Sequence, residues 1–174
     1  FDFSGYTDMA RGVGRMIGIR IMLNFNNPYL AKGLGDFWNR WHISLSSWFK
    51  DYVYIPLGGN RRGTAATYRN MALTMVISGL WHGAAWTFVI WGALHALGRF
   101  ATRELERTAF YRDQVPKLFK QLVVFAFVTF AWIFFRAASL DDALTIITRM
   151  VTDGWTDPQF PGLMLALVLS VWVY

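Results

Sequence analysis

The sequence contains no cysteine and few charged residues, since Asp, Glu, Lys and Arg make up 16% of its 174 residues. Without cysteine the chain can form no disulfide, no thiolate metal site and no acyl-enzyme on a cysteine sulfur. Three histidines are present, His42, His82 and His95, but they lie far apart in the sequence and no pair of carboxylates accompanies them. The sequence therefore predicts no metal site.

Apolar and aromatic residues dominate the composition instead. Hydrophobic residues make up 55% of the chain and aromatic residues 18%, whereas in a soluble domain about a quarter of the residues are charged. Residues 70–98 contain no Asp, Glu, Lys or Arg, and about 20 apolar residues are enough to cross a bilayer. Because this window is longer than a span needs, a tilt, a kink near Gly79 and Gly83 or an interfacial extension is expected. The net charge of +6 comes from basic residues that flank the apolar segments. A membrane protein is therefore expected, and a nucleic-acid partner is not.

The pattern predicts an all-α fold, a polytopic integral membrane bundle of helices with interfacial amphipathic helices. The chain begins with Phe1 and ends inside an apolar run, which predicts a single fragment, residues 1–174, of a longer membrane domain. The expected segments are the end of a span over residues 1–25, an interfacial helix over 36–55, a central span over 71–98, a span over 120–136, a surface helix over 139–151 and the start of a further span over 160–174. Asp36 is expected to cap the interfacial helix, and Ser139 with Asp142 forms a capping box for the surface helix.

His82 stands out because it lies near the middle of the uncharged window, between Trp81 and Gly83. An ionisable side chain within a span is costly and indicates a function, although a histidine bonded to a neighbouring helix is the structural alternative. Burial disfavours the imidazolium, so the ring would be neutral and able to accept a proton. Ser78 lies one turn before His82 and Trp86 one turn after it, on the same face of the expected helix.

The other two histidines are weaker candidates. His42 lies beside Trp41 in the expected interfacial helix, and from the pattern alone it is either part of the amphipathic surface or a functional residue. His95 lies near the end of its segment, on a different face from His82, and is expected to be structural. The many tryptophans are expected to face lipid or the core, with the walls of a tunnel as the alternative.

Two long, tryptophan-rich motifs carry a resemblance to a known family. They are DFWNRWHISLSSWFKDYVYIPLGGN, residues 36–60, and SGLWHGAAWTFVIWGALH, residues 78–95. Together with FDFSGYTDMARGVGRMIGI at residues 1–19 and TFAWIFFRAASLDDAL at residues 129–144, they closely resemble the membrane-bound O-acyltransferases, and within that family the branch that acetylates exopolysaccharides such as alginate. The resemblance covers nearly the whole chain.

The resemblance implies roles for particular residues. The membrane-embedded histidine of the family matches His82, and its second histidine, in the WHISLS motif, matches His42. Both are therefore expected to be catalytic, and the expected walls of the substrate tunnel are Ser78, Trp81, Trp86 and Trp41. The implied reaction moves an acyl group, expected to be acetyl, from a thioester to a hydroxyl, with His82 accepting a proton in a tunnel that excludes water.

The same resemblance implies the setting of the reaction. The expected acyl donor is a thioester co-substrate, acetyl-CoA or an acyl carrier, with no bound cofactor. The acceptor is expected to be a polysaccharide, reached with periplasmic partner proteins, and the location a bacterial inner membrane crossed several times. Two alternatives remain: transfer of D-alanine to teichoic acid from a carrier protein, and a proton-relay or transporter subunit, which would require carboxylates at depth.

Overall fold

The computed structural model describes residues 2–152, and every regular element within that range is helical. In chain order the elements are α1 (Asp2–Met16), the 3₁₀ turn η1 (Pro28–Leu30), α2 (Leu34–Arg40), α3 (Ile43–Phe49), the π turn η2 (Lys50–Tyr54), α4 (Gly63–His82), α5 (Trp86–Arg107), the π turn η3 (Phe110–Gln114), α6 (Lys117–Arg136) and α7 (Leu140–Thr152). The described part thus agrees with the expected all-α class. The span expected over residues 160–174 lies outside the described residues.

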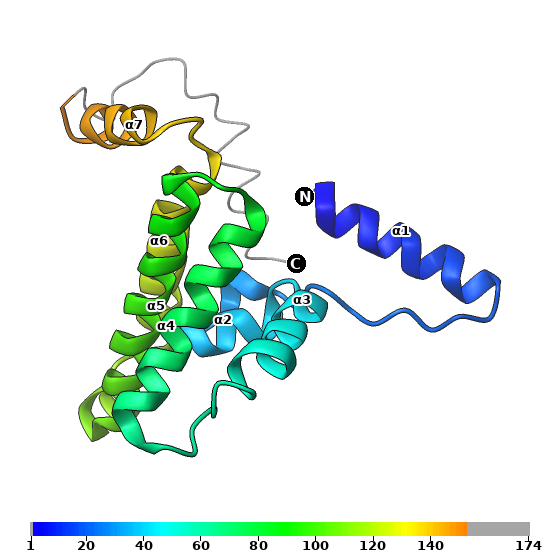
Figure 1. The fold of residues 1–174 in the computed structure, drawn as a ribbon, viewed down its shortest axis with the longest axis horizontal. Helices are drawn as coiled ribbons and strands as arrows, with labels where there is room; N and C mark the ends of the chain where they lie inside the picture. The colour runs from blue at the N-terminus through cyan, green and yellow to red at the C-terminus, as the bar shows by residue number, and fades with distance from the viewer. Residues whose placement is uncertain (1, 153–174) are drawn as a thin grey trace.

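A hairpin of two long helices, α4 and α5, forms the middle of the molecule (Figure 1). The single span expected over residues 71–98 is therefore divided, because α4 ends at His82 and α5 begins at Trp86. Gly83 follows α4 with an extended backbone, φ 165° and ψ 154°. A Cβ atom there would lie 2.5 Å from Cε2 of Phe88, so the packing of the Phe88 ring on this turn requires glycine.

The two helices of the hairpin approach closely at two glycines. A Cβ atom on Gly92 would lie 2.5 Å from the carbonyl oxygen of Met75, and one on Gly79 would overlap the carbonyl oxygen of Phe88. Backbone therefore meets backbone at this interface, as small residues allow between membrane helices. These contacts set the register in which α5 presents its side chains beside the end of α4.

Helix α6 packs against α5 and carries the buried core. Its buried residues recur every three or four positions: Gln121, Val124, Val128, Ala131 and Phe134. The apolar ones pack on Leu34 and Phe37 of α2 and on Trp91 of α5, and Gln121 donates to the carbonyl oxygen of Leu30 at 2.7 Å. Among the described helices only α6 is long and apolar enough to cross a membrane, so one of the several expected spans meets that criterion.

The interfacial helix expected over residues 36–55 is split into α2, α3 and η2. His42 adopts a left-handed backbone conformation, with φ 44° and ψ 56°, which interrupts the helix between α2 and α3. Asn24 stabilises this corner, because its carbonyl oxygen accepts the N–H of Ile43 at 3.0 Å and its side-chain Oδ1 accepts the N–H of Ser44 at 3.0 Å. A distant segment thus supplies the acceptors that the first turn of α3 lacks.

The expected helix cap at Asp36 is wrong in detail. Gly33 occupies the cap position of α2, and Asp36 lies within the first turn. The Asp36 carboxylate accepts the backbone N–H of Lys32 at 3.2 Å and pairs with Arg40 at 2.6 Å. It still neutralises the positive end of the helix, but from inside the helix.

Both ends of the described chain carry helices that extend from the bundle (Figure 1). Helix α1 lies within residues 1–25, where the end of a span was expected, and an extended segment joins it to the bundle. Its Phe3 ring contacts the rings of Phe25 and His42, with centroids 5.3 Å and 4.8 Å away. Helix α7 occupies the region of the expected surface helix. Its capping box is present, since the Asp142 N–H donates to Ser139 Oγ at 3.1 Å.

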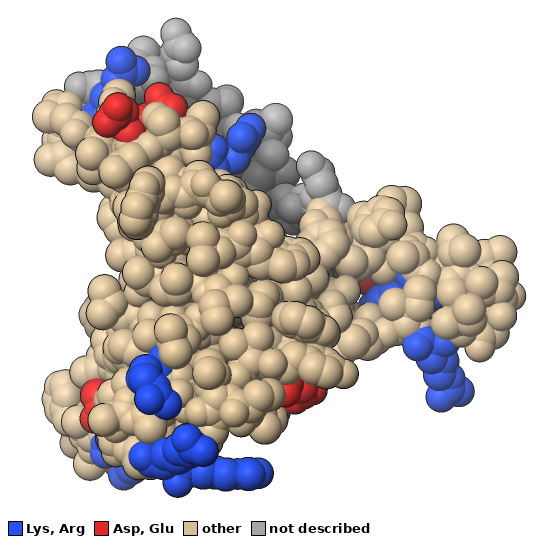
Figure 2. Space-filling view, in the orientation of Figure 1, with Lys and Arg blue, Asp and Glu red and all other residues tan. Residues whose placement is uncertain are grey.

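The charges divide along the long axis of the hairpin. In Figure 2, Lys and Arg gather at the end of the bundle where α4 begins and α5 ends, and a second charged group lies on α7 at the opposite end. The surface of the bundle between the two groups is largely uncharged in this view, and further charged side chains lie on α1. Helix α4 is about 30 Å long, the thickness of the hydrocarbon core of a bilayer.

Candidate functional site

His82 is the last residue of α4 and projects into a group of aromatic rings. Its ring lies edge-on to Phe135 of α6 and to Trp91 of α5, with centroids 4.8 Å and 5.4 Å apart. The side chain is half-buried, and neither ring nitrogen forms a hydrogen bond with another described residue. The ring is thus held by packing, while its nitrogens stay available to a substrate.

His42 occupies the corner between α2 and α3, and its neighbours orient the ring. Ser44 donates its hydroxyl proton to Asn24 Oδ1 at 2.6 Å, which leaves the Ser44 oxygen free to accept from His42 Nδ1, 3.5 Å away. This arrangement favours the tautomer with the proton on Nδ1 and leaves Nε2 as an acceptor. Burial lowers the pKa of His42, so the ring is neutral at neutral pH.

The fold brings the two histidines to the border of one aromatic cluster. His42 and His82 lie 40 positions apart in the sequence, and a series of ring contacts joins their surroundings. Trp41, the residue before His42, contacts Trp132, and Trp132 contacts Phe135, which packs on His82. Each histidine lies at a break, His42 between α2 and α3 and His82 between α4 and α5. Two helix breaks therefore border one aromatic cluster.

The four residues expected to line a tunnel occupy different environments. Ser78 is buried on α4, one turn before His82. Trp81 and Trp86 flank the break and are 58% and 75% exposed, and Trp86 belongs to α5, so the shared helix face expected for Ser78 and Trp86 does not exist. Trp41 lies in the core instead, stacked on Phe37 with centroids 5.7 Å apart.

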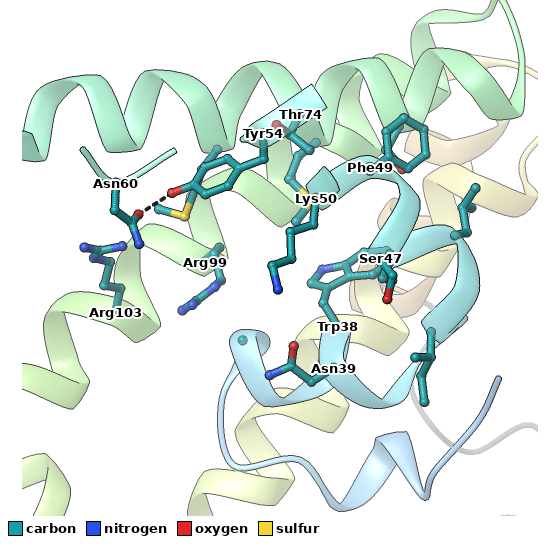
Figure 3. Close-up of a pocket in the computed structure, with 17 residues that line it drawn as sticks. Trp38, Asn39, Ser47, Phe49, Lys50, Tyr54, Asn60, Thr74, Arg99 and Arg103 are labelled. Atoms are coloured by element: carbon teal, nitrogen blue, oxygen red, sulfur yellow. Dashed lines mark hydrogen bonds between the residues drawn. The ribbon is translucent and has the colours of Figure 1, made fainter. Parts of the chain in front are cut away.

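A cavity of about 330 Å³ lies between the α2–α3 corner and the hairpin (Figure 3). On α4 it is lined by Met71, Thr74, Met75 and Ser78, which share one face of the helix. The next position on that face is His82, about 6 Å beyond Ser78 along the axis. The far end of the cavity carries Lys50, Arg99 and Arg103. The cavity thus runs along α4 from a basic end to Ser78, and neither histidine is part of its lining.

Several residues of this region could not be found from local pattern. Trp91 and Phe135 hold the His82 ring but look like ordinary apolar residues of their helices, and Arg99 marked only the end of the uncharged window. His95, expected to be structural, is 1% exposed and surrounded by Trp38, Trp91, Phe37 and Phe127. Within residues 2–152 no three His, Asp or Glu side chains lie together in a way that could hold a metal ion.

Comparison with protein families decides which family this arrangement belongs to. Residues 1–140 match the model of the membrane-bound O-acyltransferase family. The chain belongs to this family. The predicted family is confirmed, and membership in it makes the chain part of a membrane protein.

Individual relatives show more closely what the chain is similar to. It is 49% identical to a probable alginate O-acetylase of Azotobacter vinelandii over 99% of this chain, and 48% identical to a peptidoglycan O-acetyltransferase of Helicobacter pylori over 87%. A teichoic acid D-alanyltransferase of Streptococcus thermophilus is 37% identical over 56% of the chain. The chain spans about a third of the first two relatives, 36% and 29% of their lengths.

Proposed function

We propose that this chain carries the reaction centre of a membrane-embedded O-acetyltransferase that passes an acetyl group from a thioester donor to a hydroxyl group of an extracellular polysaccharide. The observation that carries the proposal is that His42 and His82, each at a helix break, border one aromatic cluster, one helical turn beyond Ser78 in the wall of the cavity. The relatives named as alginate O-acetylase and peptidoglycan O-acetyltransferase support both the acyl group and the class of acceptor.

His82 acts as the proton acceptor in the proposed step. The hydroxyl oxygen of the acceptor attacks the thioester carbonyl carbon, and its proton passes to a ring nitrogen of His82. The new carbon–oxygen bond forms as the carbon–sulfur bond breaks, and the proton then passes from His82 to the departing thiolate. The aromatic rings of Trp91 and Phe135 exclude water, which would otherwise compete as a nucleophile.

His42 positions one of the substrates. With Nδ1 directed at Ser44, its Nε2 can accept a hydrogen bond from the hydroxyl of the acceptor or orient the donor beside His82. The setting proposed for this chemistry is a bacterial inner membrane crossed several times, with acetyl-CoA or an acyl carrier as co-substrate and periplasmic proteins that complete the acetylation of the polymer.

The test replaces His82 in the full-length protein. His82→Ala and His82→Gln are expected to abolish acetylation of the polymer, because neither side chain can accept the proton, while membrane insertion is unchanged. Acetate on the purified polysaccharide, measured by NMR, reports activity, and the amount of protein in the membrane fraction reports insertion. Acetate at the wild-type level in either variant would refute the role of His82.

D-Alanyl transfer is the second candidate, because the teichoic acid D-alanyltransferase matches a contiguous half of the chain. Mass spectrometry of the modified polymer separates the two reactions, since one leaves acetyl on a glycan and the other leaves alanyl on a polyol phosphate. The lower identity and the smaller matched share favour acetyl transfer to a glycan.

A further inference from the structure

The end of the cavity away from the histidines is basic and has no carboxylate in its wall. Its lining includes Lys50 of η2 and Arg99 and Arg103 of α5, and no Asp or Glu. None of these three cations forms an ion pair with another described residue. Figure 3 shows Lys50, Arg99 and Arg103 around the same space, with Tyr54 and Asn60 joined by a hydrogen bond beside them.

Arg99 is held in place without a polar partner. Its Nη1 atom is buried and forms no hydrogen bond with the described residues. Its guanidinium lies flat against α2 at Gly35, where a Cβ atom would come within 2.7 Å of Arg99 Cζ. Burial lowers the pKa of Arg99, and the positive charge of Arg103 adds to this effect, whereas Glu106 and Tyr54 oppose it. A partly buried cation with a donor atom that lacks a partner is unfavourable, so the site is suited to an anion that comes from outside the protein.

The number of cations indicates which anion. Arg103 lies 5.7 Å from the centroid of the Tyr68 ring, which fixes its direction, and Lys50 approaches from the other side of the cavity. Three positive charges match a doubly charged phosphate better than a single carboxylate, and the planar guanidinium of arginine binds phosphate oxygens in pairs. We infer that the basic end of the cavity, formed by Lys50, Arg99 and Arg103, binds the phosphate group of an organic phosphate.

The distance from this end to His82 fits one extended ligand. The ring contact between Tyr68 and Phe100, 4.8 Å between centroids, places Arg99 at the level of Tyr68 on the antiparallel α4. His82 lies about 21 Å further along the α4 axis. A phosphate bound at Arg99 would thus be separated from the reaction centre by the length of the cavity. A thioester donor that carries its phosphate at one end and its acyl group at the other would fit this separation. This use of the site depends on the proposed function, whereas phosphate binding itself does not.

The test measures binding of two phosphate compounds to the full-length protein in phosphate-free detergent. Coenzyme A represents the soluble donor, and phosphatidylglycerol represents a lipid headgroup; native mass spectrometry and calorimetry measure each one. Arg99→Gln and Lys50→Gln are expected to weaken the bound compound at least tenfold. Arg107→Gln is the matched control, because Arg107 lies on the same helix, is exposed and pairs with Glu104, and should bind within twofold of wild type.

The pattern of loss identifies the source of the phosphate. Weaker coenzyme A binding with unchanged phosphatidylglycerol supports the donor, and the reverse supports a lipid. Equal binding of both compounds by wild type and both variants, or binding of neither by wild type, would overturn the inference. Lys50 is exposed, so Lys50→Gln keeps the test valid if Arg99→Gln fails to fold. His82→Ala should bind the phosphate compound normally, so failure of the acyl-transfer proposal would leave this result unaffected.

Discussion

Replacing Gly92 with alanine tests the packing that brings α5 beside the end of α4. A Cβ atom at this position would lie 2.5 Å from the carbonyl oxygen of Met75 and 3.0 Å from Val76 Cα. These separations are about 1 Å shorter than ordinary contact distances, and the groups that would be met are backbone, which cannot rotate away. The hairpin must therefore open, at a cost of about 1–3 kcal/mol.

The matched control is Gly12→Ala in α1, where a Cβ atom would meet nothing within 4 Å. Alanine stabilises a helix interior by about 0.5–1 kcal/mol relative to glycine, and this gain applies to both variants. The difference in unfolding free energy between Gly92→Ala and Gly12→Ala therefore isolates the packing cost of about 1–3 kcal/mol. Titration of the full-length protein with sodium dodecyl sulfate, followed by tryptophan fluorescence, measures this difference.

Opening of the hairpin should also reduce acetylation, because Trp91, the residue before Gly92, packs on the His82 ring. Gly92→Ala is therefore expected to lose polymer acetate at a protein level where Gly12→Ala retains it. Equal stability and equal acetate in the two variants would refute the close approach of α4 and α5.

Three further predictions concern single side chains. Ser139→Ala should lower the local stability of α7 by about 1 kcal/mol through loss of its cap; hydrogen exchange of the α7 amides checks this, and unchanged protection would contradict it. His95→Phe should keep or raise the unfolding free energy. Both ring nitrogens of His95 are buried without a partner among the described residues, and its ring packs on aromatic neighbours that would also accept phenylalanine. A clear loss of stability would contradict this reasoning. Burial lowers the pKa of His42 below its usual 6.5. The free energy of unfolding is compared with that of His42→Asn, because asparagine tolerates the left-handed conformation. The stability that His42 adds should be complete above pH 6.5 and decline as the pH falls below it, because the unfolded chain binds the proton first. Unfolding titrations of both proteins from about pH 8 to about pH 5 measure this decline, and a constant difference would count against it.

Features that depend on neighbouring residues in the sequence could be predicted. The helix over Leu140–Thr152 and its Ser139–Asp142 capping box follow from spacing alone. The apolar helix α6 follows from composition, with its ends at Lys117 and Arg136 close to the expected limits. In both cases the cause of the structure lies within a few residues of its effect.

The helix break at His42 could not be predicted in the same way, because the groups that stabilise it lie elsewhere in the chain. His42 turns left-handed where Asn24, 18 positions earlier, supplies acceptors to α3. A continuous helix over residues 36–55 was the local expectation, whereas a kink near Gly79 and Gly83 was one of three expected ways to accommodate the length of residues 71–98. The proximity of His42 and His82 depends on both breaks, so periodicity could not reveal it, and only the family resemblance indicated the pair.

The break after His82 bears on why a titratable ring lies in an uncharged stretch. In the middle of a span, an imidazolium would meet only hydrocarbon and side chains, and proton transfer to it would be strongly disfavoured. As the last residue of α4, His82 lies instead at the negative end of a helix dipole, which stabilises a positive charge by about 0.3–1 kcal/mol and by up to about 2 kcal/mol where the group is partly buried. The surrounding Trp91 and Phe135 rings keep the resting ring neutral. In the proposed step, the apolar walls would thus favour the neutral base before the reaction, and the helix end would favour the cation that forms when His82 accepts the proton.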